Sequence, residues 1–163
     1  MCQRFDFLVK KTCSSIDVDK ASLEDVGWTW DFTYTSQMLE PECGTWSGKT
    51  TFYGWSDDVR NKVGKAEYVV PKGITELSIS FRSCAHTDKS PVVLYKITNG
   101  KTTKINEAQI RGSGKTERVS VTQGDKIQLK DEGVNSVVQI TKFEVCELTE
   151  ESKRLHSVCA PKF

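Results

Sequence analysis

The sequence lacks both the long apolar run of a membrane protein and the charge excess of a nucleic-acid-binding protein. Its longest apolar stretches, such as residues 92–95, fall far short of the roughly 20 residues needed to cross a bilayer. It carries 23 Lys and Arg against 22 Asp and Glu, and the signs are interspersed, so no broad positive field attracts nucleic acid or anionic lipid. We therefore expect neither membrane insertion nor a nucleic-acid partner.

Signatures of common enzymes are also missing. The sequence contains no GxSxG, HExxH, P-loop or GxGxxG pattern, and its Gly-Lys-Thr at residues 114–116 lacks the first P-loop glycine. Acidic pairs such as Glu40 with Glu42, or Asp57 with Asp58, do not establish the two carboxyls across a cleft that glycoside hydrolysis needs. The sequence therefore predicts a protein that is not an enzyme, and a small hydrolase is the weakest alternative.

The cysteine pattern favours disulfides over a metal or redox site. The six cysteines form an even set without a CxxC pair, as expected for a protein of an oxidising compartment. Against this, residues 1–11 lack the pattern of a signal peptide, and no Asn-x-Ser/Thr glycosylation acceptor occurs. We predict an extracellular or cell-surface protein without its signal peptide, with the cytoplasm as the alternative. The cysteines are Cys2, Cys13, Cys43, Cys84, Cys146 and Cys159.

Aromatic residues alternate with polar ones early in the chain. Trp28, Trp30, Phe32 and Tyr34 follow a period of two, which predicts one strand with four aromatic side chains on a single face. Because such a patch is rarely exposed on a monomer, we expect this face to lie in the core.

Short strands separated by turn residues recur along the rest of the chain. The pattern predicts strands at residues 77–81, 92–97, 117–121, 126–129 and 137–145, and Asn99-Gly100 is the preferred centre of a type I′ hairpin turn. Two segments have helix signals: residues 22–26, with Ser22 as the N-cap, and residues 149–158, where acidic residues precede basic ones. The fold class predicted is an all-β antiparallel sandwich or barrel with a short C-terminal helix.

An ordered set of motifs spans residues 28–146. It consists of Gly54-Trp55, residues 64–73, the strand ending in Ser83-Cys84, residues 92–95, 123–129 and 135–140, and Val145-Cys146. This order resembles the galactose-binding-like β-sandwich superfamily, which includes many carbohydrate-binding modules. The resemblance implies an antiparallel jelly roll of eight or nine strands over residues 28–146, with ligands bound by loops at one rim or on a concave sheet face. Residues 1–27 would then be an extension packed on the domain, and residues 147–163 a helical tail.

Two of the cysteines end predicted strands. Cys84 ends one strand and Cys146 ends the last one, so we predict a disulfide between them. The other four cysteines would attach the terminal extensions to the sandwich, and the sequence leaves their pairing open.

A glycine-rich stretch after residue 43 combines aromatic and charged residues in the way a sugar site requires. A flat aromatic ring contacts the C–H face of a sugar, and charged or amide groups bind its hydroxyls. The alternative is that Trp46 and Trp55 anchor the core, because aromatic residues dominate core energetics. The candidate ligand-binding residues of this stretch are Trp46, Tyr53, Trp55, Asp57, Asp58 and Arg60.

A second group of polar residues, Arg82, His86 and Asp88, follows a predicted strand and would line the same rim. Cys84, His86 and Asp88 do not complete the ligand set of a zinc site, so we expect no metal there. The resemblance alone suggests calcium at Asp57 and Asp58, whose pattern otherwise fits solvated loop carboxylates. We therefore expect no cofactor.

These observations predict a non-catalytic module that recognises a carbohydrate or glycan through the rim loops of a β-sandwich. The alternative is a secreted or cell-surface protein that binds another surface protein or has a structural role. The sequence leaves the oligomeric state open.

Overall fold

The computed structural model describes residues 5–32, 34–39, 50–55, 64–83, 91–108, 115–131 and 137–154. Within these ranges the chain forms eleven strands and one helix. In chain order they are β1 (Phe5–Ile16), α1 (Lys20–Asp25), β2 (Trp28–Asp31), β3 (Tyr34–Leu39), β4 (Thr50–Trp55), β5 (Lys65–Val69), β6 (Ile74–Ser83), β7 (Val92–Thr98), β8 (Lys101–Ala108), β9 (Lys115–Ser120), β10 (Lys126–Asp131) and β11 (Val137–Arg154).

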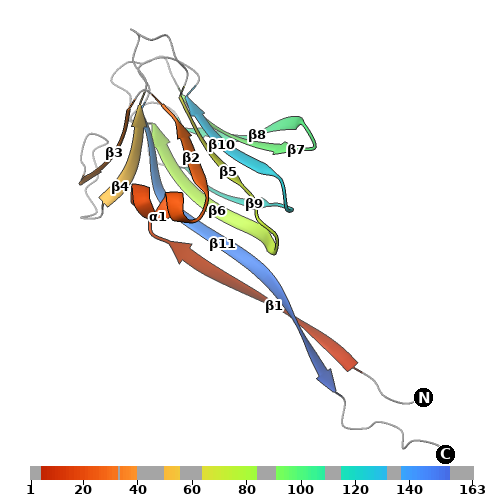
Figure 1. Cartoon of the computed structure of the whole chain (residues 1–163). Coiled ribbons are helices and arrows are strands. Elements are labelled where there is room, and N and C mark those ends of the chain that lie inside the picture. The colour runs from red at the N-terminus through yellow and green to blue at the C-terminus, as the bar shows by residue number, and fades with distance from the viewer. Residues whose placement is uncertain are drawn as a thin grey trace, which may run out of the picture.

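The strands form two antiparallel sheets that pack face to face (Figure 1). The six-stranded sheet has the order β3-β4-β11-β6-β9, with β1 added on β11, and the five-stranded sheet has the order β2-β5-β10-β7-β8. Apolar side chains from both sheets form one core, in which Phe52, Phe81 and Phe143 meet Tyr68 and Leu129. The predicted all-β jelly-roll sandwich is confirmed.

The hairpin between β7 and β8 forms at the predicted Asn-Gly pair. Asn99 has a φ of 50° and Gly100 a φ of 79°, so both central residues adopt the left-handed conformation that a type I′ turn requires. The strands leave the turn in register, with Thr98 opposite Lys101.

The aromatic segment at residues 28–34 is not one strand, as predicted, but parts of two. β2 ends at Asp31 in the five-stranded sheet, and β3 begins at Tyr34 in the six-stranded sheet. The chain therefore changes sheets here. A period of two in the sequence does not reveal such a change, because the alternation of aromatic and polar residues continues through it.

The expected core position of these aromatics is confirmed for Trp28 and Phe32, which are both buried. Trp30 is half-buried: its ring stacks on Phe52 with centroids 3.8 Å apart, and its indole N–H donates to Glu24 at 2.7 Å. The aromatic side chains of β2 therefore pack into or against the core.

The N-cap of the short helix α1 lies three residues earlier than predicted. Its N-cap is Asp19, whose carboxylate accepts from the backbone N–H of Ser22 at 2.9 Å and from the Ser22 hydroxyl at 2.8 Å. Ser22 is therefore inside the helix, and its predicted role as the N-cap is wrong. The helix packs into the sandwich through Leu23, which is fully buried.

The predicted C-terminal helix is not present in residues 149–154, which continue β11. Thr149 lies opposite Lys10 of β1 and donates its hydroxyl to the Lys10 carbonyl at 3.3 Å. The order of acidic and basic residues does suit a helix, but β1 supplies a ladder of backbone partners from the other end of the chain. Residues 155–158 lie outside the described residues.

Beyond Glu147, β11 leaves its neighbour β6 and remains paired with β1 alone among the described strands. Residues 5–11 of β1 and 148–154 of β11 thus form a two-stranded ribbon that projects from the sandwich, and we call it the arm (Figure 1). The described residues contain no helix that is long and apolar enough to cross a membrane.

Candidate functional site

The six-stranded sheet has one face toward the core and one away from it, which we call the outer face. On β4, Phe52 is fully buried, and a Cβ added at Gly54 would lie 2.6 Å from ring carbons of Phe32. Positions 52 and 54 therefore face the core, and strand alternation assigns positions 51, 53 and 55 to the outer face. The strand that carries two predicted ligand-binding aromatics, Tyr53 and Trp55, thus places both positions on this face.

Three strands contribute to one row across the outer face. The register sets Gln139 of β11 between position 53 of β4 and Arg82 of β6. The Gln139 amide donates to the Thr51 hydroxyl at 2.7 Å, and these two side chains are only 5 % and 4 % exposed. Arg82 is half-buried beside Gln139. Amide, hydroxyl and guanidinium groups together offer the donors and acceptors that sugar hydroxyls need.

Serine residues of β6 continue this polar row along the sheet. Ser78 and Ser80 alternate with the core residues Leu77 and Ile79, and such alternation is typical of a strand with one solvent-exposed face. Both are instead buried, with exposed fractions of 4 % and 9 %. Neighbouring groups on the outer face therefore cover the hydroxyls of Ser78 and Ser80.

The two sequence segments with predicted site residues leave the sheet at the same rim. β4 and β6 lie on either side of β11 and run parallel to each other, since both are antiparallel to β11. Trp55 at the end of β4 pairs with Val137, and Ser83 at the end of β6 pairs with Val138. Of the predicted site residues, Trp46, Asp57, Asp58, Arg60, His86 and Asp88 lie outside the described residues.

The opposite half of the outer face holds a network of ion pairs that the sequence did not predict. Glu76 of β6 binds Lys11 of β1 at 2.9 Å and also Arg118 of β9, which lies 3.6 Å from Glu144 of β11. The hydrogen bonds from Lys11 and then Arg118 lower the pKa of the Glu76 carboxyl below its usual range. These ion pairs therefore link four strands, β1, β6, β9 and β11, across this half of the face.

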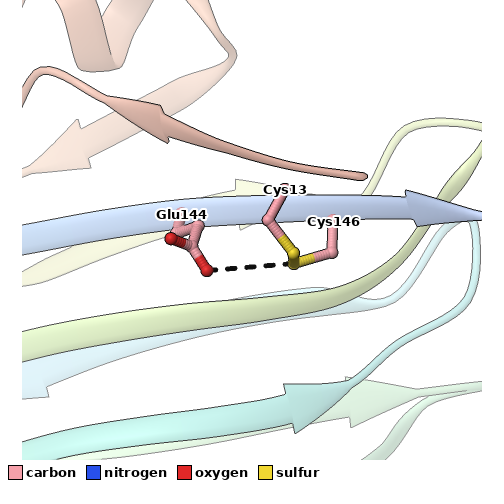
Figure 2. Close-up of side chains that lie close together, drawn as sticks. All are labelled: Cys13, Glu144 and Cys146. Carbon is pink, nitrogen blue, oxygen red and sulfur yellow. Dashed lines mark hydrogen bonds between the residues drawn. A yellow bond between two sulfur atoms is a disulfide. The ribbon is translucent and has the colours of Figure 1, made fainter. Parts of the chain in front are cut away.

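A disulfide lies beside this network. Cys13 of β1 and Cys146 of β11 are direct register partners, and their sulfurs are bonded at 2.06 Å (Figure 2). The predicted pairing of Cys146 with Cys84 is therefore wrong, and Cys84 itself lies outside the described residues. A position at the end of a strand does not reveal a register partner that is 133 residues away.

Glu144 completes a cluster with this disulfide. Its carboxylate oxygen lies 3.9 Å from the Cys146 sulfur, and both come from β11 (Figure 2). Cys13, Glu144 and Cys146 are the one group of metal-ligating residue types that the described ranges bring together. Zinc binds thiolates, and neither sulfur is a thiolate in the disulfide, so the oxidised protein has no zinc site here.

A hollow of about 530 Å³ lies where β1 ends beside the bulge of β11. Residues 15–19 and residues 141–143 line it, and among them are Asp17, Asp19 and Lys142. The pKa of Asp19 is lowered, but the cause is its hydrogen bonds with Ser22 as the helix cap. The shift therefore reports helix capping and does not indicate acid–base chemistry.

Comparison with known proteins bears on the fold. No family model matches the sequence, and no curated protein matches it. Among solved structures, a mutant of a carbohydrate binding module of family 29 matches with a TM-score of 0.52 and 12 % identity, over 84 % of this chain and 92 % of that one. The chain shares the fold of a carbohydrate-binding module. TmCBM61 in complex with β-1,4-galactotriose matches with a TM-score of 0.48 and 14 % identity, over 85 % of this chain and 100 % of that one.

Proposed function

We propose that this protein is a non-catalytic carbohydrate-binding module that binds a glycan on the outer face of its six-stranded sheet, near the rim where β4 and β6 end. The observation that carries the proposal is the row formed by position 53, Gln139 and Arg82. Trp55 lies two residues farther along β4, at the end of the strand. The likeness in fold to carbohydrate-binding modules supports the same function.

The chemistry of this row suits a sugar. Tyr53 and Trp55 supply aromatic rings of the kind that contact the C–H face of a pyranose. The Gln139 amide is already held by Thr51, so it loses little conformational freedom when a ligand binds. A neutral ligand also fits the chain's charge balance, since Lys and Arg exceed Asp and Glu by only one.

The site would extend into the predicted loop residues. Trp46, Asp57, Asp58 and Arg60 would join it from the side of β4, and His86 and Asp88 from the side of β6. Loops on a rigid sandwich can vary their chemistry without disturbing the core, which is why sites often lie there. An extracellular or cell-surface location is part of this proposal, and the disulfide between Cys13 and Cys146 supports it.

Screening the intact protein on a glycan array tests the proposal. We expect binding to a defined set of glycans, and loss of that binding in Trp55→Ala and Arg82→Ala. Far-UV circular dichroism of both variants reports whether the fold is retained. A blank array for the intact protein would contradict the proposal.

A further inference from the structure

The arm has an unpaired edge along β1. β11 is its neighbour on one side, and the described strands provide none on the other. A free two-stranded ribbon is marginally stable in water, whereas three or more strands with an apolar face can be stable. An unpaired strand edge is also a template for another strand. The arm would therefore be stabilised by further strands.

Apolar residues on one face of the arm are exposed to solvent. Val9 is 60 % exposed and Leu148 is 48 % exposed. Val9 pairs with Glu150, and Leu148 with Lys11, so alternation places Val9 and Leu148 on the same face. The sequence adds Phe5 and Phe7 at the other odd positions of β1.

The disulfide shows which backbone groups point toward the free edge. The Cα atoms of Cys13 and Cys146 are 4.0 Å apart, as in the closer, non-hydrogen-bonded pairs of an antiparallel ladder. Pairs of the two kinds alternate along the ladder, so every odd-numbered residue of β1 is in a non-hydrogen-bonded pair, as Cys13 is. The backbone N–H and C=O groups of Phe7 and Val9 therefore point away from β11. A second strand along this edge would hydrogen-bond to these odd residues.

We propose that the occupant of this edge is the β1 strand of a second copy of the chain, paired antiparallel about a two-fold axis at Leu8. This register sets Phe7 opposite Val9 of the other copy, with reciprocal backbone hydrogen bonds, and sets Asp6 opposite Lys10. Moving the axis to residue 7 or 9 would set Asp6 or Lys10 opposite Leu8 instead. The charge pattern of β1 is therefore self-complementary in this register, and the arms form one four-stranded sheet.

Disulfide trapping gives a sharp test of the register. Leu8→Cys places two cysteines directly opposite each other across the axis, in a non-hydrogen-bonded pair with Cα atoms about 4.5 Å apart. We expect covalent dimers of the full chain after mild oxidation. Lys10→Cys, on the same strand and face, is the control: its partner is Asp6, so we expect no dimer. Equal cross-linking of both variants would overturn the register.

A charge swap tests the contact without new cysteines. We expect the wild-type chain to sediment as a concentration-dependent dimer. Lys10→Asp places like charges at positions 6 and 10, which face each other at two symmetric points of the dimer. It should raise the dissociation constant by about tenfold. Asp6→Lys combined with Lys10→Asp restores the opposite charges and should restore dimerisation, whereas Lys104→Asp on β8 should change nothing. A monomer at every concentration, or a dimer unaffected by Lys10→Asp, would overturn the proposal.

Discussion

Cys13 and Cys146 are direct partners in the ladder between β1 and β11, and a disulfide joins them at Cα atoms 4.0 Å apart. Cys146 lies opposite Glu76 of β6 as well, so the bond connects β1 to the centre of the six-stranded sheet. It closes a loop that contains most of the chain, because the two residues are 133 positions apart.

Replacing both cysteines of this bond with alanine should lower the free energy of unfolding by about 2–5 kcal/mol, because the unfolded chain regains the entropy that the long loop removes. Chemical denaturation of the double variant and the wild type measures the difference. Peptide mapping without reduction should recover Cys13 linked to Cys146. Recovery of Cys84 linked to Cys146 would contradict the structure.

Replacing Asp19 with alanine removes the N-cap of α1 and should cost about 1 kcal/mol at neutral pH. The hydrogen bonds from Ser22 lower the pKa of the Asp19 carboxyl below 3.8, the usual value for an aspartate. This contribution is therefore present above pH 3.8 and is lost as the pH falls through the lowered pKa.

Unfolding curves of the wild type and Asp19→Ala at neutral and acidic pH test this loss of stability with falling pH. The two proteins should converge in stability at acidic pH. Asp19→Asn is the matched control, because asparagine also caps helices and should keep most of the stability at neutral pH. A difference between wild type and Asp19→Ala that grows on acidification would show that the cap is wrongly assigned.

Gly54 allows β4 to approach the ring of Phe32. A Cβ at position 54 would lie 2.6 Å from two ring carbons, so Gly54→Ala forces the buried ring or the strand to move. We expect a loss of about 1–3 kcal/mol of unfolding free energy, as for other overpacked cores. In a Phe32→Ala background the same substitution should cost much less, and an unchanged cost there would mean that another contact is responsible.

Local patterns in the sequence predicted those parts of the fold that depend on neighbouring residues. The Asn99-Gly100 turn is one example, because the two residues determine the turn type themselves. The change of sheet after Asp31 and the strand at residues 149–154 depend on partners far away in the chain. The partner of Cys146 was missed for the same reason.

The candidate site was predictable in part. The Trp55 and Arg82 segments were selected for their chemistry, and the structure shows that their strands end on either side of β11. Gln139 and Thr51 were not selected, because an amide and a hydroxyl within strands look like ordinary surface residues. The structure shows that they form a buried hydrogen-bonded pair, with Gln139 in the row and Thr51 two residues from position 53 on β4.

Titration of a glycan found on the array against Arg82→Ala and Lys104→Ala tests the central claim most directly. Arg82 lies in the proposed row on the six-stranded sheet, whereas Lys104 is an exposed cation on the five-stranded sheet. Losing a charged hydrogen-bonding partner costs about 1.5–3 kcal/mol, so Arg82→Ala should weaken binding by roughly 10- to 150-fold. Lys104→Ala should bind like the wild type. Equal affinity of wild type and Arg82→Ala would contradict binding on the outer face.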